Sequence, residues 1–429
     1  MLTRRRLFQS GAVTTAAMLA TQPAQSKTKN PCSPLPPSLA ALKSMKDQAT
    51  PISTSERQER QEEARRLIRA NSLDCILLCE GTSLEYFSGI RWHGSERLLA
   101  MALPATGAAF YVCPGFEEGR AREQLATGPD GKEADVRIWQ EDESPYERVA
   151  QGLKDRGIAT GMLGMEESVR FVFSEGISKA APQIKIASAT PVTAGCRRIK
   201  SAHEISLMRL ASKVTLTAYE AAYRALRDGM NKSEFEELIE AAHKQLGFEG
   251  GADAEVGEFS AFPHGSVTPQ IIREGTIVLI DGGCKVEGYC SDISRTLIVG
   301  KPTEKMKKVF DIVHVAQSTA LKTAHAGVEC QVVDAAARKV ITEAGFSPDY
   351  KFFTHRVGHG MGMDVHEWPY LVRGNTTKLE ANMTFSDEPG IYIHGEFGVR
   401  LEDDMHITEN GAELFTPQSP SLEEPFGKG

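Results

Sequence analysis

An internal repeat in the second half of the chain constrains its fold more than any other feature. The segment DGMNKSEFEELIEAAHKQLGF aligns without a gap with AGVECQVVDAAARKVITEAGF. The two copies are 98 residues apart, since Gly229 matches Gly327 and Gly247 matches Gly345. A long amphipathic helical pattern precedes each copy, and a histidine-bearing loop with strand-like runs follows it. The repeat predicts two similar halves, each with two helices and then strands, related by a pseudo-twofold axis.

Two hairpins follow the two copies, and each carries a pair of acids where a buried strand would place apolar side chains. In the first, VLIDGGCKVEGYCSDISRTL, a turn centred on KVEG sets Asp281 directly opposite Asp292. In the second, SDEPGIYIHGEFGVRLEDD, a turn centred on Gly395 sets Glu388 opposite Glu402. Like charges opposite one another destabilise a sheet, and burying an unpaired charge is costly. Two such pairs at corresponding places therefore predict that these acids hold cations.

Histidines gather around the hairpins. FFTHRVGHGMGMDVHEWPY contains His355, His359 and His366, and His264 lies in the loop before the first hairpin. Four carboxylates and an imidazole suit a pair of first-row divalent ions, most of all Mn²⁺ and otherwise Co²⁺, Fe²⁺ or Zn²⁺. Calcium is disfavoured by the histidines and by the placement of the acids on strands, since it prefers oxygen ligands from loops. We therefore expect two metal ions and hydrolytic chemistry.

The first half of the chain alternates helix-like and strand-like segments without a phosphate-binding glycine motif, which predicts an α/β domain. Before it, Arg4 to Arg6 precede a short Ala-rich apolar stretch and small residues at Ala24 and Ser26. This pattern is typical of a twin-arginine signal peptide, and a mobile basic tail is the alternative. We accordingly divide the chain into signal peptide, linker or loosely draped arm, α/β domain, repeat-containing catalytic domain and tail, at residues 1–26, 27–55, 56–197, 198–415 and 416–429.

Composition narrows the functional classes. The formal net charge is −8, and no long basic run follows residue 10, so nucleic acid and anionic membranes are disfavoured as partners. The apolar stretch of the signal peptide is too short for stable membrane insertion, and we expect release into a bacterial periplasm after cleavage. The eight cysteines form no CxxC pair and mostly lie in apolar runs, so we predict no disulfide framework.

The hairpin acids, together with GHGMG, DEPG and RLEDD, resemble the pita-bread metallopeptidases, which include Xaa-Pro aminopeptidase, Xaa-Pro dipeptidase (prolidase) and, more distantly, methionine aminopeptidase and creatinase. The resemblance runs from about residue 60 to 415 and implies an α/β N-terminal domain before an α+β pita-bread catalytic domain. It implies that Asp281 binds one metal through both oxygens and that His359 and Glu388 bind the other. Asp292 and Glu402 would bridge the two ions.

The resemblance also implies roles for neighbouring residues. Glu388 would pass a proton to the leaving proline nitrogen, and His366 and His264 would stabilise the oxyanion. The other implied active-site residues are His355, Arg400 and Tyr392. Asp387 departs from the family, which more commonly shows an apolar or small residue there. Trp92 is a candidate for contact with a neighbour's active site in a homodimer or homotetramer, or else packs at a domain boundary.

The leading hypothesis is a dinuclear-metal peptidase that hydrolyses the Xaa-Pro bond of dipeptides or at the N-terminus of short peptides. A metal-dependent hydrolase of another small amide or ester is one alternative, and a non-catalytic pita-bread protein that binds peptides is another. Methionine aminopeptidase lacks a large N-terminal α/β domain, and creatinase works without metals. The complete ligand set favours catalysis, while the choice between dipeptides and longer peptides stays open.

Overall fold

The structure is a computed structural model that describes residues 34–427. The chain from Pro37 onwards forms one compact unit, and the predicted signal peptide at residues 1–26 lies outside the described residues. None of the described helices combines the length and the apolar character needed to cross a membrane.

An α/β domain occupies the first half of this unit. Its sheet has the strand order β4-β3-β2-β1-β5-β6, formed by β1 (Cys75–Cys79), β2 (Ala100–Pro104), β3 (Phe110–Pro114), β4 (Asp135–Trp139), β5 (Gly161–Met165) and β6 (Ile184–Ser188). Strand β1 is buried on both faces because Ile76 and Leu78 enter one apolar cluster and Cys75 and Leu77 enter another. The predicted α/β domain is confirmed.

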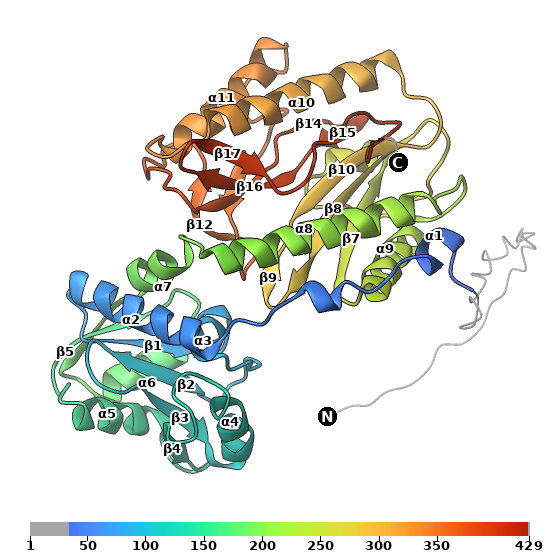
Figure 1. The fold of residues 1–429 in the computed structure, drawn as a ribbon. Coiled ribbons are helices and arrows are strands. Elements are labelled where there is room, and N and C mark those ends of the chain that lie inside the picture. The colour runs from blue at the N-terminus through green and yellow to red at the C-terminus, as the bar shows by residue number, and fades with distance from the viewer. Residues whose placement is uncertain (1–33, 428–429) are drawn as a thin grey trace, which may run out of the picture. The chain divides into compact units, whose positions relative to one another are not determined.

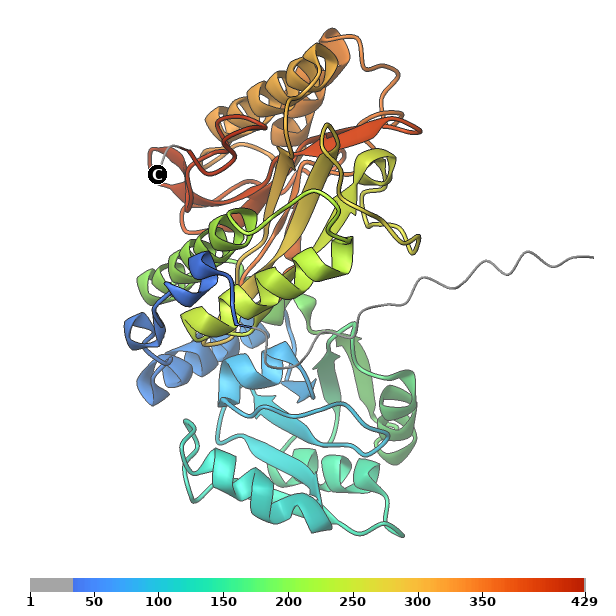
Figure 2. The same ribbon diagram turned by 90° about the vertical axis from the view of Figure 1, so that its right-hand side faces the viewer.

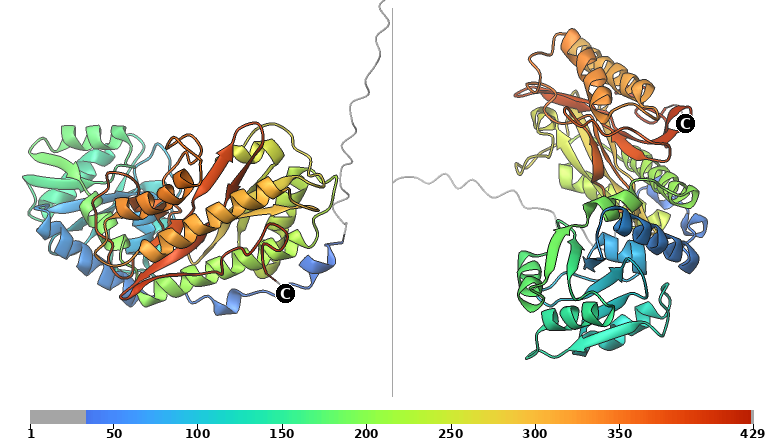
Figure 3. Two further views of the ribbon diagram at one scale, coloured as in Figure 1. Left: turned by 90° about the horizontal axis from the view of Figure 1, so that it is seen from above. Right: turned by 90° about the vertical axis from the view of Figure 1, so that its left-hand side faces the viewer.

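Helices cover both faces of this sheet (Figure 3). The first cluster receives side chains from α2 (Thr54–Ala70), α3 (Thr82–Ser88), α4 (Glu118–Leu125) and α7 (Thr190–Arg197). The second receives them from α5 (Pro145–Asp155) and α6 (Phe171–Ala180).

Part of the predicted linker is packed. Helix α1 (Pro37–Ala40) and the short 3-10 turn η1 (Lys46–Gln48) lie within it. Leu39 is fully buried, and the backbone N–H of Met45 donates to the carbonyl of Leu246 at 2.8 Å. The chain is therefore not a loose arm from Pro37 onwards, because Leu39, Met45 and Ile52 are buried.

The second half of the unit contains the two predicted repeats. The first consists of α8 (Ala202–Tyr223), α9 (Lys232–Leu246), β7 (Gly250–Val256), β8 (Ile277–Val286), β9 (Tyr289–Cys290) and β10 (Ile293–Ile298). The second consists of α10 (Glu304–Thr323), α11 (Cys330–Glu343), β11 (Gly358–Gly360), β12 (Glu367–Leu371), β13 (Thr384–Asp387), β14 (Gly390–Ile393), β15 (Phe397–Arg400), β16 (Asp403–Thr408) and β17 (Gly411–Leu414). The strands of both repeats lie between the helix pairs α8–α9 and α10–α11 (Figure 1 and Figure 2).

The repeat extends to individual hydrogen bonds. Gly247 and Gly345 both adopt left-handed backbone, with φ of 95° and 98°. In each copy the residue after this glycine donates its N–H to the carbonyl five positions earlier, at 3.1 Å in the first copy and 3.2 Å in the second. This bond belongs to the Schellman motif that ends helices at a glycine. The predicted pseudo-symmetry is confirmed.

The first hairpin turns one residue later than predicted. Asp281 lies opposite Ser294, not opposite Asp292, so the predicted direct pairing is wrong. The turn is the pair Glu287-Gly288, with positive φ of 48° and 90°, a geometry that matches the twist of the flanking strands. The residue opposite Asp281 is thus two positions further along the chain than predicted. Side chains alternate along a strand, so Asp292 still lies on the same face of the sheet as Asp281.

The second hairpin has the predicted register. The ladder of β13 with β16 and the ladder of β14 with β15 follow one common register. Glu388 and Glu402 occupy the gap between the two ladders, in the positions that this register sets opposite each other. The predicted register is confirmed, and the backbone N–H groups of Glu388 and Glu402 donate elsewhere, to the carbonyls of Val357 and Ser294.

Candidate metal centre

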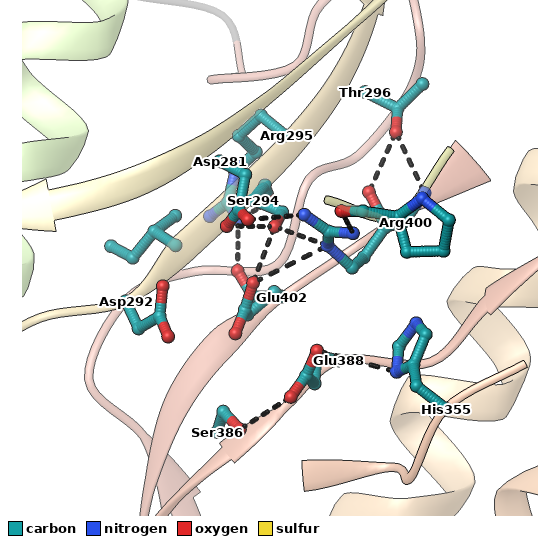
Figure 4. Close-up of polar contacts among 12 residues, drawn as sticks. Asp281, Asp292, Ser294, Arg295, Thr296, His355, Ser386, Glu388, Arg400 and Glu402 are labelled. Carbon is teal, nitrogen blue, oxygen red and sulfur yellow. Dashed lines mark hydrogen bonds and ion pairs between the residues drawn. The ribbon is translucent and has the colours of Figure 1, made fainter. Parts of the chain in front are cut away.

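Four carboxylates and one imidazole converge where the two repeats meet. One oxygen each of Asp281, Asp292 and Glu402 lie within 4.8 Å of one another, and single ligand atoms of His359, Glu388 and Glu402 do the same. Glu402 belongs to both groups, so the two groups adjoin. Figure 4 shows the four carboxylates. The structure therefore brings together all five residues predicted as ligands.

The surroundings of three of these carboxylates, those of Asp292, Glu402 and Glu388, favour the neutral form over the ionised form. Asp292 is 9% exposed and Glu402 is 2% exposed. Burial, together with the charges of the neighbouring carboxylates, raises the pKa of both residues well above the usual range. Burial likewise raises the pKa of Glu388 to about 7. Bound cations would remove this penalty.

Arg400 supplies a cation from the chain itself. Its Nη2 lies 2.5 Å from Asp281 Oδ2, and its Nε donates to Ser294 Oγ at 2.8 Å. The Ser294 hydroxyl lies 2.8 Å from Asp281 Oδ1 and 2.5 Å from Glu402 Oε2. One guanidinium cannot balance four ionised carboxylates, so full ionisation of the cluster requires further cations.

His359 presents a free nitrogen to the carboxylates. Its Nδ1 lies 3.1 Å from the Gly360 carbonyl, which can only accept, so Nδ1 carries the proton and Nε2 keeps its lone pair. Nε2 lies 3.3 Å from Glu388 Oε1 and 3.5 Å from Asp292 Oδ2. A backbone carbonyl that fixes the ring in this way is the usual support of a metal-binding histidine.

The donor set fits a pair of first-row divalent ions. Asp281 would hold one ion, and His359 with Glu388 would hold the other. Asp292 also forms such a group with His359 and His366, so Asp292 and Glu402 each lie close to the residues of both sides. Carboxylate oxygens with one imidazole suit Mn²⁺, Fe²⁺, Co²⁺ or Zn²⁺.

The centre opens into a cavity of about 520 Å³. Apart from the five candidate ligands, its walls are formed by Pro263, His264, Tyr350, Thr354, His355, Arg356, Val365, His366, Val372 and Arg400. Four other residues predicted for the active site, namely the three histidines and Arg400, therefore line the same cavity as the ligands.

A hydrogen-bonded chain links Arg400 to a neutral histidine. Arg400 Nη1 donates to the hydroxyl of Tyr392 at 3.2 Å, and this hydroxyl lies 2.6 Å from His355 Nε2. His355 Nδ1 lies 2.8 Å from the Arg356 carbonyl, so Nε2 accepts from the tyrosine. Burial lowers the pKa of His355 to about 3, which keeps the ring neutral. Tyr392 thus holds two side chains of the cavity wall, Arg400 and His355, without lining the cavity itself.

Two residues of the site were not foreseen from the sequence. Ser294 connects Asp281, Glu402 and Arg400, and Arg356 faces the cavity. A signal for Ser294 existed, because it lies two positions after Asp292 and alternation places it on the same face. Arg356 directly follows a histidine of the motif, but nothing in the local pattern distinguishes a cavity arginine from a surface one.

Besides Tyr392, two further residues singled out by the sequence do not line the cavity. Trp92 packs against an apolar cluster that the α/β domain shares with the catalytic half, with the Arg120 guanidinium 4.6 Å from its ring centroid. Asp387 is fully buried opposite Asp403, and its carboxylate oxygens have no hydrogen-bond partner among the described residues. Burial and the neighbouring acids raise the pKa of Asp387 well above the usual range, which favours a neutral carboxyl behind the centre.

The chain is similar to known metallopeptidases over most of its length. The sequence pattern of metallopeptidase family M24 matches residues 206–409, and that of the creatinase/prolidase N-terminal domain matches residues 60–199. A putative dipeptidase of Bacillus subtilis is 34% identical over 341 residues, which cover 79% of this chain and 92% of that protein. An Xaa-Pro dipeptidase of Pyrococcus horikoshii is 32% identical over 355 residues, covering 82% and 95%. The crystal structure of dipeptidase PepE from Mycobacterium ulcerans, 31% identical, superposes with a TM-score of 0.81 and covers 87% of this chain and 99% of that one.

Metal removal should destabilise the protein more at high pH than at low pH. In the metal-free fold the pKa values of Asp292, Glu402 and Glu388 lie above their unfolded values. The contribution of these acids to the free energy of unfolding is therefore fully present below pH about 4 and is lost as the pH rises through about 7. Glu388 alone accounts for roughly 3 kcal/mol of it. Thermal unfolding of chelator-treated protein should thus show a Tm that falls between pH 5 and pH 8.

Added Mn²⁺ should raise the Tm more at pH 8 than at pH 5, because protons compete with the metal for carboxylates. Asp292→Asn, which removes one of the buried charges, should flatten the pH dependence of the chelated protein. A Tm of the chelated wild-type protein that rises with pH over this range would contradict the interpretation.

Proposed function

The chain belongs to metallopeptidase family M24, and from this premise we propose that it hydrolyses the Xaa-Pro bond of dipeptides with two divalent ions, with Mn²⁺ as the preferred metal. The observation that carries the proposal is the single cluster of Asp281, Asp292, His359, Glu388 and Glu402 at the base of the cavity. The complete cluster favours catalysis over a protein that only binds peptides.

The residues around the centre divide the catalytic work. When bound, the two ions would lower the pKa of an attacking water and polarise the scissile carbonyl. Glu388 is the candidate proton carrier, because it lines the cavity beside His359 and Ser386 Oγ donates to its Oε1 at 3.3 Å. His264 and His366 line the cavity, where their imidazoles can stabilise the developing oxyanion.

The cavity wall also contains a cation that suits a free carboxylate. No described carboxylate forms an ion pair with Arg356, whose guanidinium lies 4.1 Å from the ring centroid of Tyr370. Burial, together with the positive charge of Arg356, lowers the pKa of His366, so this charge acts on the reacting end of the cavity. The α-carboxylate of an Xaa-Pro dipeptide is the anion that a dipeptidase must bind. Arg356 therefore supports dipeptides over longer peptides, in agreement with the dipeptidase names of the relatives.

We further propose export by the twin-arginine route to the periplasm, and assembly as a homodimer or homotetramer in which Trp92 reaches a neighbour. The arginines at residues 4–6 and the small residues at Ala24 and Ser26 support export. Cell fractionation should recover a chain shortened by about 26 residues in the periplasm, and light scattering should give its subunit number. An intact chain confined to the cytoplasm, or a monomer, would count against the corresponding proposal.

Purified protein reconstituted with Mn²⁺ should hydrolyse Xaa-Pro dipeptides. A dipeptide with alanine in place of proline should be cleaved at a rate lower by roughly two orders of magnitude, because a pocket built for one side chain discriminates on that scale. Release of free proline is the measurement. Absence of turnover on every proline dipeptide, with two ions demonstrably bound, would leave hydrolysis of another small amide or ester as the better reading.

Arg356→Gln should reduce kcat/KM for an Xaa-Pro dipeptide by roughly 10–100-fold, since a charge-assisted contact to the carboxylate is lost. The same variant should cleave the corresponding dipeptide amide as well as the wild-type protein does. Arg224→Gln, on an exposed arginine that pairs with Glu220 on α8, is the matched control and should change neither rate. Equal losses of kcat/KM on the dipeptide and on its amide would show that Arg356 does not bind the α-carboxylate.

A further inference from the structure

His366 differs from the other histidines of the site in how its ring is held. The rings of His355 and His359 are fixed by hydrogen bonds to backbone carbonyls. Among the described residues no hydrogen bond holds the imidazole of His366, which lies edge-on to His359 with ring centroids 4.0 Å apart. The position of this ring in the cavity therefore depends on the backbone that carries it.

That backbone is a tight loop folded around a buried carboxylate. Glu367 Oε1 accepts the N–H of Met363 at 2.9 Å and that of Asp364 at 3.1 Å. The Glu367 side chain is 5% exposed, so its charge requires partners inside the protein. The loop that presents His366 is thus organised by the residue directly after it.

The partners of Glu367 come from the end of the α/β domain. Arg197, the last residue of α7, places Nη2 2.5 Å from Glu367 Oε1 and 2.6 Å from Asp364 Oδ2. Lys200 Nζ lies 3.2 Å from Glu367 Oε2. Burial alone would raise the pKa of Glu367, but Lys200 and Arg197 outweigh it and bring the pKa down to about 2. The carboxylate is therefore charged and fully engaged.

Arg197 is itself held in place. Its Nη1 donates to Ser83 Oγ at 3.3 Å, and Ser83 donates in turn to Glu166 at 2.5 Å. Asp364 is tied to the same domain by the hydroxyl of Thr82, at 2.5 Å. One guanidinium thus connects α3 and α7 of the α/β domain with both ends of the loop that carries His366.

We infer that Arg197 is a positioning residue for catalysis, which sets the place of the His366 imidazole in the cavity through Asp364 and Glu367. The inference rests on the proposed function, because it takes the role of His366 from there. A rate effect is expected because a misplacement of about 1 Å at a reacting group can cost a large factor.

A second contact between the same parts of the chain makes the role of Arg197 separable from folding. Arg60 of α2 places Nη2 3.1 Å from Glu204 Oε1 and 2.7 Å from the hydroxyl of Tyr289, which itself donates to Glu204 at 2.6 Å. This buried cluster anchors the tip of the first hairpin and the start of α8 to the α/β domain without Arg197. Loss of Arg197 should leave that anchor in place.

The first experiment compares two adjacent arginines in the full-length, metal-loaded protein. Arg197→Gln should lower kcat on an Xaa-Pro dipeptide by roughly 10–100-fold with KM changed by less than about 3-fold, because orientation and not substrate binding is lost. Arg197→Lys, which keeps the charge but not the fork geometry, should recover part of this loss. Arg198→Gln is the matched control, since Arg198 pairs only with the exposed Glu380 among the described acids, and it should keep the wild-type kcat.

A double-mutant cycle with His366→Ala separates positioning from general damage. If Arg197 acts through His366, Arg197→Gln should cost less than about 2-fold once the imidazole is absent. A loss of the same size in both backgrounds, a loss of bound metal from Arg197→Gln, or a wild-type kcat in that variant would overturn the inference.

Hydrogen exchange supplies a readout that does not depend on activity. The amides of Met363 and Asp364 should exchange at least about 10-fold faster in Arg197→Gln than in Arg198→Gln, because their acceptor loses its partner. Unchanged exchange would overturn the inference even if the proposed function holds. Faster exchange together with full activity of His366→Ala would instead contradict the role of His366 in the proposed function. If Arg197→Gln does not fold, the same two measurements on Arg197→Lys decide the question.

Discussion

The mutual repulsion of four carboxylates in one buried cluster is the constraint on which the rest of the structure depends. Each repeat contributes two acids whose carboxylate oxygens lie within 4.8 Å of each other, and two such charges repel when no cation is near. The pseudo-twofold arrangement brings the pairs together, so that Asp292 and Glu402 can serve both sides of the cluster. Arg400 offsets part of the charge, and divalent ions would supply the remainder. The shape of the catalytic half thus follows from the need to hold these oxygens rigidly around cations.

Much of this site could be predicted because its signals are local and periodic. The register of the second hairpin follows from a turn at Gly395, and the repeat follows from glycines that end equivalent helices. The first hairpin shows the limit of such counting. Its tight turn at Glu287-Gly288 moved the partner of one acid by two positions, and only the alternation of strand faces preserved the cluster.

The residues that sequence reasoning missed act through contacts between distant segments. Arg197 reaches a loop 167 residues later, and Ser294 meets Glu402 across 108 residues. No local pattern distinguishes such an arginine from its half-buried neighbour Arg198, which pairs with the exposed Glu380. The α/β domain therefore does more than accompany the catalytic half, because its buried cations fix the backbone next to the cavity. The contacts of Arg197 and Lys200 with Glu367 hold the backbone that carries the His366 ring, which no hydrogen bond among the described residues holds directly.

The central claim is that the five candidate ligands form one site for two adjacent ions. Anomalous diffraction from crystals grown with Mn²⁺ tests it most directly. The account predicts two peaks about 3.5 Å apart, one near Asp281 and the other near His359 and Glu388, with Asp292 and Glu402 between them. A single peak, or peaks that lie away from these side chains, would contradict it.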